Sequence, residues 1–366
     1  MNLPQAFREA FLDTRLHDLQ TRLGRLTQTP GHVGKGSRVA IYVMFPTRGF
    51  LESHAIALRN LAAKGYAPLV VTNAPLTAEA REIVLSLCWS LIERQNFGYD
   101  FGGYRAAILA LGKTLSELDR LVLMNDSVWY PLPGGRDWLD DVDGMTVDFL
   151  GTVSNEGVGH VELEEFRQMT WHYDMRRTYF HYCSFGLAFG PAVLRDPNFV
   201  VFWRKFRLTN NKFRTIRRGE VGLSQFLMAR GYSHCDIMGV AEFGREVAEM
   251  EESTLADWIE KLVIPEDDRL ATLGHEVMAR RGSPEWETEA RAFLMLAAAR
   301  TGMAYALPAY ALAVKGHVML KKSPLKLSAE GARRTLAFLA SLTGPGADTY
   351  LAEAKVAAAE RPDPLQ

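Results

Sequence analysis

Apolar runs of β-type residues alternate with segments of helical spacing along the first third of the chain. RVAIYVMF starts at Arg38, APLVVT at Ala67 and RLVLM at Arg120, and each run is continuous enough for a strand buried on both faces. The segment FLESHAIALRNLAAKGY has apolar residues at helical spacing and reaches Gly65 at a helix C-cap position. Strands that alternate with helices predict an α/β fold of Rossmann type, with a mostly parallel sheet flanked by helices.

The chain divides into three segments by composition. Residues 1–36 contain a helical pattern and then most of the Gly/Pro-rich stretch TQTPGHVGKGS, which is typical of a linker. Residues 37–245 hold the alternating pattern, and residues 246–366 are helical in spacing and rich in Ala, Glu and Arg. We therefore expect an N-terminal helix and linker, one α/β domain and a helical C-terminal extension.

Positive and negative charges are balanced, with 42 Lys and Arg against 43 Asp and Glu and a net charge of -1. This balance argues against a nucleic-acid-binding protein, although a local basic patch still suits an anion. The three cysteines, Cys88, Cys183 and Cys235, are odd in number and lack CxxC spacing. That pattern disfavours a disulfide framework or a structural zinc site, and it favours the reducing cytoplasm.

The sequence contains no window of about 18 uninterrupted apolar residues, the length needed to predict a membrane-spanning helix. The nearest approach is residues 292–316, which Arg300, Pro308 and Lys315 interrupt. Buried helices are favoured there over contact with a membrane surface. The N-terminal residues 1–20 carry too many charges for a secretory signal peptide.

Polar residues follow three of the predicted strands at their carboxyl ends. Asn73 follows APLVVT, the loop Asn96–Asp100 comes after LIER, and the triplet NDS at 125–127 follows RLVLM. Parallel α/β sheets bind ligands beyond the carboxyl ends of their strands. These side chains are therefore expected to line one crevice.

The loop in ERQNFGYDFGGY combines glycines with a single aspartate. The glycines allow the backbone to approach a ligand closely or to adopt positive φ. Asp100 suits two roles, either the cap of a helix that begins near Phe101 or a contact to the base or sugar of a nucleotide. The flanking arginines suit a phosphate, or equally a solvated surface. The candidate nucleotide-binding residues of this region are Asn73, Arg94, Asn96, Gly98, Asp100, Gly102 and Arg105.

The NDS triplet places an acid at the end of a buried strand. Asp126 must be paired, solvated or metal-bound there, because a buried unpaired carboxylate is costly. Mg²⁺ commonly binds through one or two carboxylates together with substrate phosphates. Asp126 is therefore the candidate ligand of Mg²⁺ or Mn²⁺, while Asn125 and Ser127 offer neutral oxygens or bind a ribose. The alternative is a strand-ending Asx turn. Trp129, beside the triplet, suits stacking on a sugar.

A basic run extends from Arg204 to Arg218, with seven Lys and Arg residues and no acid. Such a run suits a diphosphate leaving group, an anionic lipid-linked acceptor or an acidic membrane surface. A solvated helix face fits the same pattern, and the balanced overall charge disfavours single-stranded nucleic acid.

Glu220 follows the basic run directly. It suits a general base that takes a proton from an acceptor hydroxyl, or a carboxylate placed at a helix N-terminus. His181 and Ser184, in HYCSFGLAFG, suit sugar hydroxyls or a metal, or a packed and hydrogen-bonded position.

Taken in order, these motifs resemble the rhamnan synthesis F family of bacterial polysaccharide proteins. That family shows (R/N)ExxGxDFGgy, LLNDSvyGPL, DFwG, an H-x-x-S-y segment and an E-x-G-l-s segment. The resemblance covers roughly residues 38–240. The matching segments are ERQNFGYDFGGYRAAI, LDRLVLMNDSVWYPL, VDFLGTVS, HYCSFGLAFG and GEVGLSQFLMARGY.

The resemblance implies a cytoplasmic glycosyltransferase with a GT-A-like fold, which builds an O-antigen, a capsule or a related cell-surface glycan, often on a lipid carrier. The implied donor is a nucleotide-diphosphate sugar, usually dTDP-rhamnose. Asn96, Gly98 and Asp100 are implied to lie at the nucleotide. Asn125 and Asp126 are implied to stand where GT-A enzymes carry an Asp-x-Asp metal motif. The residues implied to face the donor sugar and acceptor are His181, Ser184 and Glu220.

Three departures from the family pattern bear on these expectations. NDS has one acid where the usual metal motif has two, VWYP replaces a v-y-G-P pattern, and Phe185 stands where Tyr is common. Inversion is expected because a β-linked nucleoside diphosphate rhamnose would give the α-rhamnosides typical of such glycans. The resemblance thus implies an inverting glycosyltransferase with Glu220 as base, at the inner face of the plasma membrane if it contacts one. A UDP- or GDP-sugar donor stays open, as does a non-catalytic subunit that binds a glycan or nucleotide sugar on a degenerate transferase fold.

Overall fold

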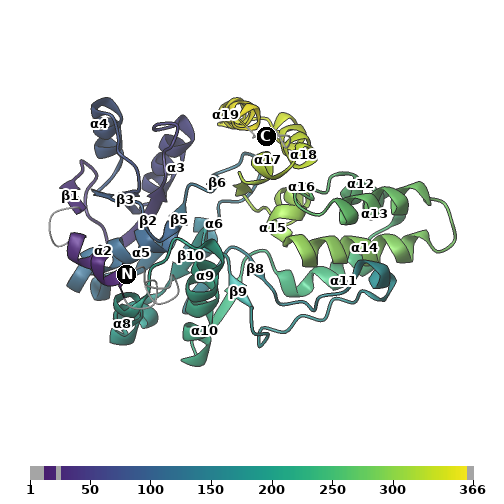
Figure 1. Ribbon diagram of the computed structural model, residues 1–366, viewed down its shortest axis with the longest axis horizontal. Helices are drawn as coiled ribbons and strands as arrows, with labels where there is room; N and C mark the ends of the chain where they lie inside the picture. The colour runs from purple at the N-terminus through teal and green to yellow at the C-terminus, as the bar shows by residue number, and fades with distance from the viewer. Residues whose placement is uncertain (1–11, 22–25, 361–366) are drawn as a thin grey trace, which may run out of the picture. The chain divides into compact units, whose positions relative to one another are not determined.

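A central sheet organises the first part of the molecule. The computed structural model describes residues 12–21 and 26–360, and within these ranges eight strands form one sheet in the order β1-β4-β3-β2-β5-β10-β7-β11 (Figure 1). The strands are β1 (Leu26–Pro30), β2 (Arg38–Met44), β3 (Ala67–Thr72), β4 (Ser90–Arg94), β5 (Arg120–Asn125), β7 (Phe149–Gly151), β10 (Gly186–Phe189) and β11 (His234–Asp236).

The core of this sheet is parallel. β2 pairs in parallel with both β3 and β5, and β3 pairs in parallel with β4. β10 is antiparallel to its neighbours β5 and β7, so β7 runs in the same direction as the parallel core. All six residues of β3 are buried, as its continuous apolar run predicted. The predicted fold class, a mostly parallel α/β sheet flanked by helices and followed by a helical C-terminal region, is confirmed.

The edge strand β1 departs from the sequence prediction. Leu26–Pro30 lies within residues predicted as helix end and linker, yet it pairs antiparallel with β4. Local propensity gives no strand signal here. The outer edge of β4, however, has backbone N–H and C=O groups that need hydrogen-bond partners, and β1 supplies them. Of the N-terminal helix predicted over residues 1–27, α2 (Asp13–Gln20) is present, while residues 1–11 and 22–25 lie outside the described ranges.

The described chain divides into two compact units that interleave along the sequence. One comprises the residues up to Asp126 together with Val142–Gly151 and His181–Cys235, and the other comprises Ser127–Asp141, Thr152–Phe180 and the residues from Asp236 onward. The segments predicted from composition, 1–36, 37–245 and 246–366, are contiguous, and that division stays a prediction.

Helices cover both faces of the sheet in the first unit. The right-handed connections from β2 to β3 and from β3 to β4 put α3 and α4 on one face, and the return from β4 to β5 puts α5 on the other (Figure 1). The helices of this unit are α2, α3 (Glu52–Ala63), α4 (Ala78–Leu87), α5 (Tyr99–Leu111), η2 (Gly112–Glu117), α7 (Pro191–Arg195), α8 (Pro197–Lys205), α9 (Lys212–Ile216), the π-helix η4 (Arg217–Val221) and α10 (Gly222–Ala229).

The second unit is mainly helical. Its long helix α14 buries Phe293, Leu294 and Leu296, and β6 (Val128–Trp129) pairs with β12 (Leu320–Lys321). Its helices are η3 (Leu163–Gln168), η5 (Val240–Glu242), α11 (Phe243–Ala248), α12 (Glu252–Glu260), α13 (Asp268–Ala279), α14 (Trp286–Thr301), α15 (Met303–Ala306), α16 (Pro308–Ala313), α17 (Pro324–Leu327), α18 (Ala329–Ala340) and α19 (Ala347–Ala359). The short elements α6 (Trp138–Asp143), β8 (Ser154–Asn155) and β9 (His181–Tyr182) complete the described chain. Among the helices described, none has the length and apolar character needed to cross a membrane.

Gly103 sets how closely α5 approaches the sheet. A Cβ at this position would lie 2.7 Å and 2.8 Å from the two Cγ atoms of Val43 on β2. The close approach puts the start of α5 directly over the carboxyl end of the central strand, where the candidate site begins.

Replacing Gly103 tests this packing. Gly103→Ala is expected to lower the free energy of unfolding by about 1–3 kcal/mol through overpacking, despite the better helix propensity of Ala. Gly222→Ala is the matched control, because its Cβ would meet only the Arg217 carbonyl oxygen at 3.6 Å. The control should be neutral or stabilising by up to about 1 kcal/mol. Urea denaturation compares the two, and equal stability of both variants would contradict the close-packing account.

His317 makes the stability of the second unit depend on pH. Burial lowers the pKa of His317 from 6.5 to about 4. The unfolded chain therefore binds a proton between pH 6.5 and 4 that the folded chain does not, so stability falls as pH falls through this window. The full difference is worth about 3 kcal/mol.

Replacing His317 should remove this dependence. Urea midpoints of His317→Gln are expected to fall less steeply between pH 6.5 and 4 than those of the wild type. His275→Gln, at an exposed position on α13, should keep the wild-type slope. Identical slopes for the wild type and His317→Gln would contradict the assignment.

Candidate functional site

Asp100 lies at the centre of a hydrogen-bond network in the first unit. Its Oδ2 accepts a hydrogen bond from Ser184 Oγ at 2.7 Å and another from Asn125 Nδ2 at 3.1 Å. Asp100 stands in the first turn of α5, Asn125 ends β5, and Ser184 precedes β10. Three sequence motifs thus meet near the carboxyl end of β5. Strand-end position predicted the approach of Asp100 and Asn125, whereas it gave no prediction for Ser184.

The same geometry corrects the predicted helix cap. α5 begins at Tyr99 with Gly98 as its N-cap residue, at φ 85°. Asp100 is therefore inside the helix, and one of its carboxylate oxygens accepts from side chains of two other elements rather than only from its own helix. Gly98 is required at this N-cap because the left-handed conformation is costly for residues with a Cβ.

Tyr104, one helical turn after Asp100 on α5, also belongs to the network. Its hydroxyl donates to the Ser184 carbonyl at 2.8 Å and accepts from Asn125 Nδ2 at 3.1 Å. Burial raises the pKa of Tyr104 well above its usual value, and the charges of Asp100, Glu220 and Asp126 raise it further. The hydroxyl is thus a neutral donor with three carboxylates in its surroundings.

Glu220 joins the network through Ser184. Its Oε1 accepts from the Ser184 backbone N–H at 2.8 Å, and its Oε2 lies 3.8 Å from His181 Nε2. The Glu220 side chain keeps 16% of its surface exposed and His181 keeps 9%, so the carboxylate is held in place yet open to a ligand.

A π-helix positions Glu220. The turn η4 interrupts the continuous helical stretch from α9 to α10, and such π-bulges are frequent at functional sites. Glu220 lies two turns after the start of α9 at Lys212, so the alternative of a carboxylate at a helix N-terminus does not describe it.

Asp126 lies beside the network and contacts the amino end of α3. Its Oδ2 accepts from the Phe45 backbone N–H at 2.7 Å and lies 3.6 Å from His54 Nε2. His54 Nδ1 accepts from the Leu51 N–H at 3.1 Å, so in the neutral ring the proton is on Nε2 and faces Asp126. The carboxylate keeps 20% of its surface exposed.

A metal ion bound beside Asp126 would have few protein ligands. Across residues 12–21 and 26–360, the structure has no group of three or more His, Cys, Asp and Glu side chains that could hold one. A cation at this edge would therefore take only one or two protein carboxylates, with Asp126 the nearest to the predicted role, and its remaining ligands from substrate oxygens.

The arginines predicted as phosphate ligands are bound within the first unit. Arg105 donates to both carboxylate oxygens of Asp18 on α2, at 2.6 Å and 2.9 Å, and to the Trp203 carbonyl. Arg94 donates to Asn73 Oδ1 at 2.6 Å. Burial and the nearby Arg105 lower the pKa of Arg94 to about 10. Two of the predicted residues, Asn73 and Arg94, thus bind each other, while Arg105 joins α2 to the domain.

The rest of the glycine loop is shaped by close backbone contacts. The Gly98 N–H donates to Asn210 Oδ1 at 2.9 Å, and a Cβ on Gly102 would lie 2.1 Å from the Phe97 carbonyl oxygen. Asn96 is exposed. The glycines therefore serve the tight turn, and Asn96 is placed at its surface.

Two predicted site residues belong to the second unit. Ser127 Oγ accepts from Lys321 Nζ at 3.1 Å, and Trp129 is buried with its indole N–H donating to Glu353 Oε2 at 3.0 Å. The unit boundary falls directly after Asp126. These two hydrogen bonds of Ser127 and Trp129 are internal to that unit, and Trp129 offers almost no surface for stacking.

Sequence reasoning missed Tyr104 and His54. Tyr104 stands four residues after Asp100 in a predicted helix, so the spacing alone would place both side chains on one face. His54 lies on α3, which follows β2, the strand next to β5. It is separated from Asp126 by 72 positions, and no local motif marks the pair.

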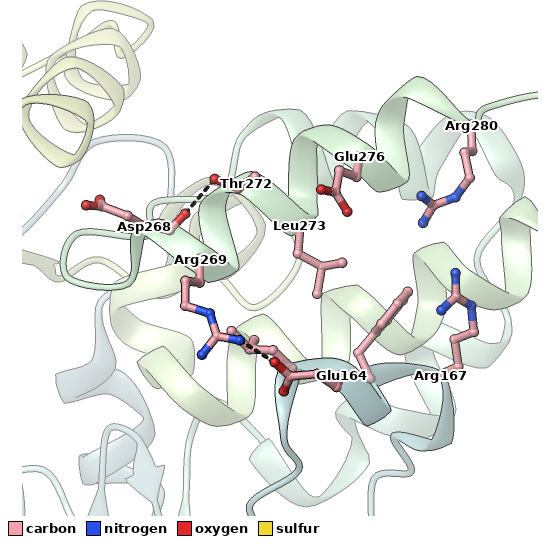
Figure 2. Close-up of a pocket in the computed structure, with 10 residues that line it drawn as sticks. Glu164, Arg167, Asp268, Arg269, Thr272, Leu273, Glu276 and Arg280 are labelled. Carbon is pink, nitrogen blue, oxygen red and sulfur yellow. Dashed lines mark hydrogen bonds and ion pairs between the residues drawn. The ribbon is translucent and has the colours of Figure 1, made fainter.

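A cavity of about 460 Å³ lies in the second unit between η3 and α13. Figure 2 shows Arg167 and Arg280 facing each other there and Arg269 reaching toward Glu164. Arg167 and Arg280 each bind the buried Glu289 at 2.7 Å. None of the predicted site residues lines this cavity, and three of its arginines are engaged in ion pairs.

Comparison with known proteins places the chain in a family. The family model described as rhamnan synthesis protein F matches residues 69–256. The chain belongs to this family. The matched range includes Asp100, Asn125, Ser184 and Glu220, so the hydrogen-bond network is built from residues of the family region.

A relative and two solved structures are similar to this chain. The uncharacterized protein y4gN of Sinorhizobium fredii is 32% identical over 206 residues, which is 56% of this chain and 50% of that protein. The chain thus spans about half the length of this curated relative. Core-mannan synthase A from Aspergillus fumigatus, in a Mn/GDP form, has a TM-score of 0.29 and 10% identity over 54% of this chain and 71% of that one. The mannosyltransferase Ktr4p from S. cerevisiae has a TM-score of 0.26 and 8% identity, over 56% and 71%.

Removing the Tyr104 hydroxyl tests the network. Tyr104→Phe leaves the Ser184 carbonyl and the Asn125 amide without this partner, which is expected to cost about 1–3 kcal/mol of unfolding free energy. Tyr99→Phe is the matched control, because the Tyr99 side chain is 42% exposed and its hydroxyl donates to the carbonyl of the surface residue Asn210 at 3.1 Å. The control should change stability by less than about 0.5 kcal/mol. Equal effects in chemical denaturation would show that the buried network contributes nothing.

Proposed function

We propose that the protein is a glycosyltransferase that takes a sugar from a nucleotide-diphosphate donor and adds it to a growing cell-surface polysaccharide. The observation that carries the proposal is the meeting of Asp100, Asn125, Ser184 and Glu220 in one network, within a chain of the rhamnan synthesis F family. Partly exposed carboxylates at the carboxyl end of a parallel sheet are suited to bind a polar ligand and to accept a proton from it.

The proposed donor is dTDP-rhamnose, and the proposed transfer inverts the configuration of the sugar. The family supports rhamnose, and a UDP- or GDP-sugar is the alternative donor. The proposed acceptor is a glycan or a lipid-linked glycan, reached from the cytoplasmic side of the membrane with peripheral contact. Asn96, Gly98 and Asp100 are the residues proposed to lie at the nucleotide.

Glu220 is proposed as the general base. Its Oε1 is fixed by the Ser184 N–H at 2.8 Å, which leaves Oε2 to receive the acceptor proton. His181, at 3.8 Å from Oε2, is proposed to orient the acceptor hydroxyl together with the carboxylate. As the proton moves to Glu220, the hydroxyl oxygen attacks the anomeric carbon, and the nucleoside diphosphate leaves with the bonding electrons.

Asp126 is proposed to act at the diphosphate through a divalent cation. Asp100, Asp126 and Glu220 all raise the pKa of Tyr104, so the region is rich in negative charge and would repel a bare diphosphate. A Mg²⁺ or Mn²⁺ ion, when bound, would offset the charge that develops on the leaving group. Asp126 would hold it with phosphate oxygens, and the Phe45 N–H and His54 orient the Asp126 carboxylate.

A non-catalytic subunit is the second candidate. It is favoured by the single acid of the NDS triplet, where a metal motif commonly has two. Such a protein would bind a nucleotide sugar or glycan without turnover, and measurement of binding and transfer on one sample separates the two functions.

A variant of the base tests the enzyme proposal. Glu220→Gln keeps an oxygen that accepts from the Ser184 N–H but removes the proton acceptor. Turnover is therefore expected to fall about 10²–10⁴-fold, with donor affinity changed less than about threefold. Glu117→Gln is the control, since its side chain is 67% exposed on η2. Full transferase activity in Glu220→Gln would remove the base assignment.

A donor panel tests the substrate and the cation. dTDP-rhamnose, UDP-glucose, UDP-galactose and GDP-mannose are titrated by calorimetry and assayed for transfer, each with Mg²⁺, Mn²⁺ or EDTA. Selective binding of dTDP-rhamnose and loss of turnover in EDTA and in Asp126→Asn are the expected results. Binding of a donor without turnover under every condition favours the non-catalytic subunit.

A further inference from the structure

The cavity between η3 and α13 brings together charges of both signs. Its volume of about 460 Å³ is in the range of small-molecule sites. Three arginines, three acids and apolar side chains line it, and all of them belong to the second unit. No residue assigned to the transfer reaction is among them, so the chemistry of the cavity depends on these side chains alone.

Two guanidinium groups face each other across the cavity. Figure 2 shows Arg167 on η3 directed toward Arg280, the C-cap residue of α13. Each donates through its Nε to the buried carboxylate of Glu289, at 2.7 Å. Burial raises the pKa of Glu289, but the hydrogen bonds from Arg280 and Arg167 outweigh this effect and lower the pKa. Two cations therefore share one anion.

The other nitrogens of this pair are left to a ligand. Within the residues that the structure describes, neither guanidinium has a second hydrogen bond, and Arg280 Nη2 is buried without a partner. Arg167 lies over the Phe166 ring at 4.6 Å, which holds the guanidinium plane in place. Two fixed guanidinium groups with donors to spare suit a carboxylate, whose two oxygens accept from both.

Glu276 supplies the opposite charge. It stands four positions before Arg280, the spacing at which an acid and a base usually pair on a helix. Arg280 binds Glu289 instead, and Glu276 has no ion pair or hydrogen bond to any side chain that the structure describes. Figure 2 shows the Glu276 and Arg280 side chains both extending toward η3. This acid suits the ammonium group of a ligand.

The two other acids of the lining are less suited to a ligand. Glu164 forms an ion pair with Arg269. Asp268 lies in the first turn of α13, and Figure 2 shows its side chain pointing away from the guanidinium pair. A ligand between η3 and α13 therefore meets two cations and one unpaired carboxylate within one helical turn.

Apolar side chains lie beside these charges. Leu273 stands one turn before Glu276 and extends from α13 toward η3 in Figure 2. Leu163 and Phe166 of η3 are buried and line the same cavity. A short hydrocarbon group can lose its contact with water against these residues.

We propose that this cavity binds a small zwitterion, namely a free α-amino acid with an apolar side chain. Its carboxylate lies between Arg167 and Arg280, its ammonium group donates to Glu276, and its side chain packs against Leu273. The site goes beyond the proposed transfer reaction, because its occupancy is measured by binding alone and needs no nucleotide sugar.

Calorimetry on the full chain tests the proposal with three probes of one carbon skeleton. These are leucine, isocaproate, which lacks the ammonium group, and isoamylamine, which lacks the carboxylate. Leucine is expected to bind at least about tenfold more tightly than either of the others, because it alone satisfies both the arginines and the acid. Equal affinity for isocaproate, equal affinity for isoamylamine, or no saturable binding of leucine would overturn the proposal.

A variant of the acid locates the ammonium group. Glu276→Gln is expected to weaken leucine binding at least about tenfold, because a neutral amide replaces the partner of a cation. Glu276 is exposed, so the thermal transition should stay at the wild-type temperature. Glu285→Gln, at an exposed position outside the cavity, should change the affinity less than about threefold. Wild-type affinity in Glu276→Gln, or equal weakening by both variants, would remove the site.

A variant of the guanidinium pair locates the carboxylate. Arg167→Gln leaves Glu289 bound to Arg280 and is expected to weaken leucine binding at least about tenfold. Arg281→Gln is the control, because this arginine also gives up a surface ion pair, with Glu252, but does not line the cavity. It should change the affinity less than about threefold. Equal affinities of the two variants would contradict the assigned carboxylate position.

Discussion

The hydrogen bonds that Asp100 accepts from Ser184 and Asn125 connect the elements on which the candidate site depends. They join the start of α5, the end of β5 and the segment before β10. These segments are 25 and 59 positions apart along the chain, so their meeting requires the whole sheet order. A partly buried carboxylate is stable there because its lone pairs are satisfied, and the same bonds hold the carboxylate at the edge where ligands of parallel sheets bind.

The first unit has negative side chains around Tyr104 and positive side chains between α8 and α10. Asp100, Asp126 and Glu220 gather around the Tyr104 hydroxyl and raise its pKa, whereas a cleft between α8 and α10 is lined by four cations. The π-helix η4 carries one residue of each group, Glu220 among the carboxylates and Arg218 among the cations. The three carboxylates suit proton transfer and a bound cation.

Local patterns predicted the parallel core and the strand-end motifs because buried strands and alternating helices leave strong signals over five to ten residues. Other features depend on distant partners. Arg105 pairs with Asp18, 87 positions away, β1 forms because β4 has an open edge, and Trp129 packs inside the second unit near Glu353. The sequence marked Glu220 as a candidate base, but the π-helix that positions it leaves no local signal in the sequence. Asp100 and Asn125 were expected to lie close together and are hydrogen-bonded, while Ser127 follows the chain into the second unit.

A crystal structure of the full chain soaked with dTDP-rhamnose and Mg²⁺ tests the central claim most directly. The account predicts density for the nucleotide sugar at the carboxyl end of β5, with the sugar within reach of Glu220 and the diphosphate beside Asp126. Density in the cavity between η3 and α13 instead, or a vacant network at saturating donor, would contradict the assignment of this edge as the donor site.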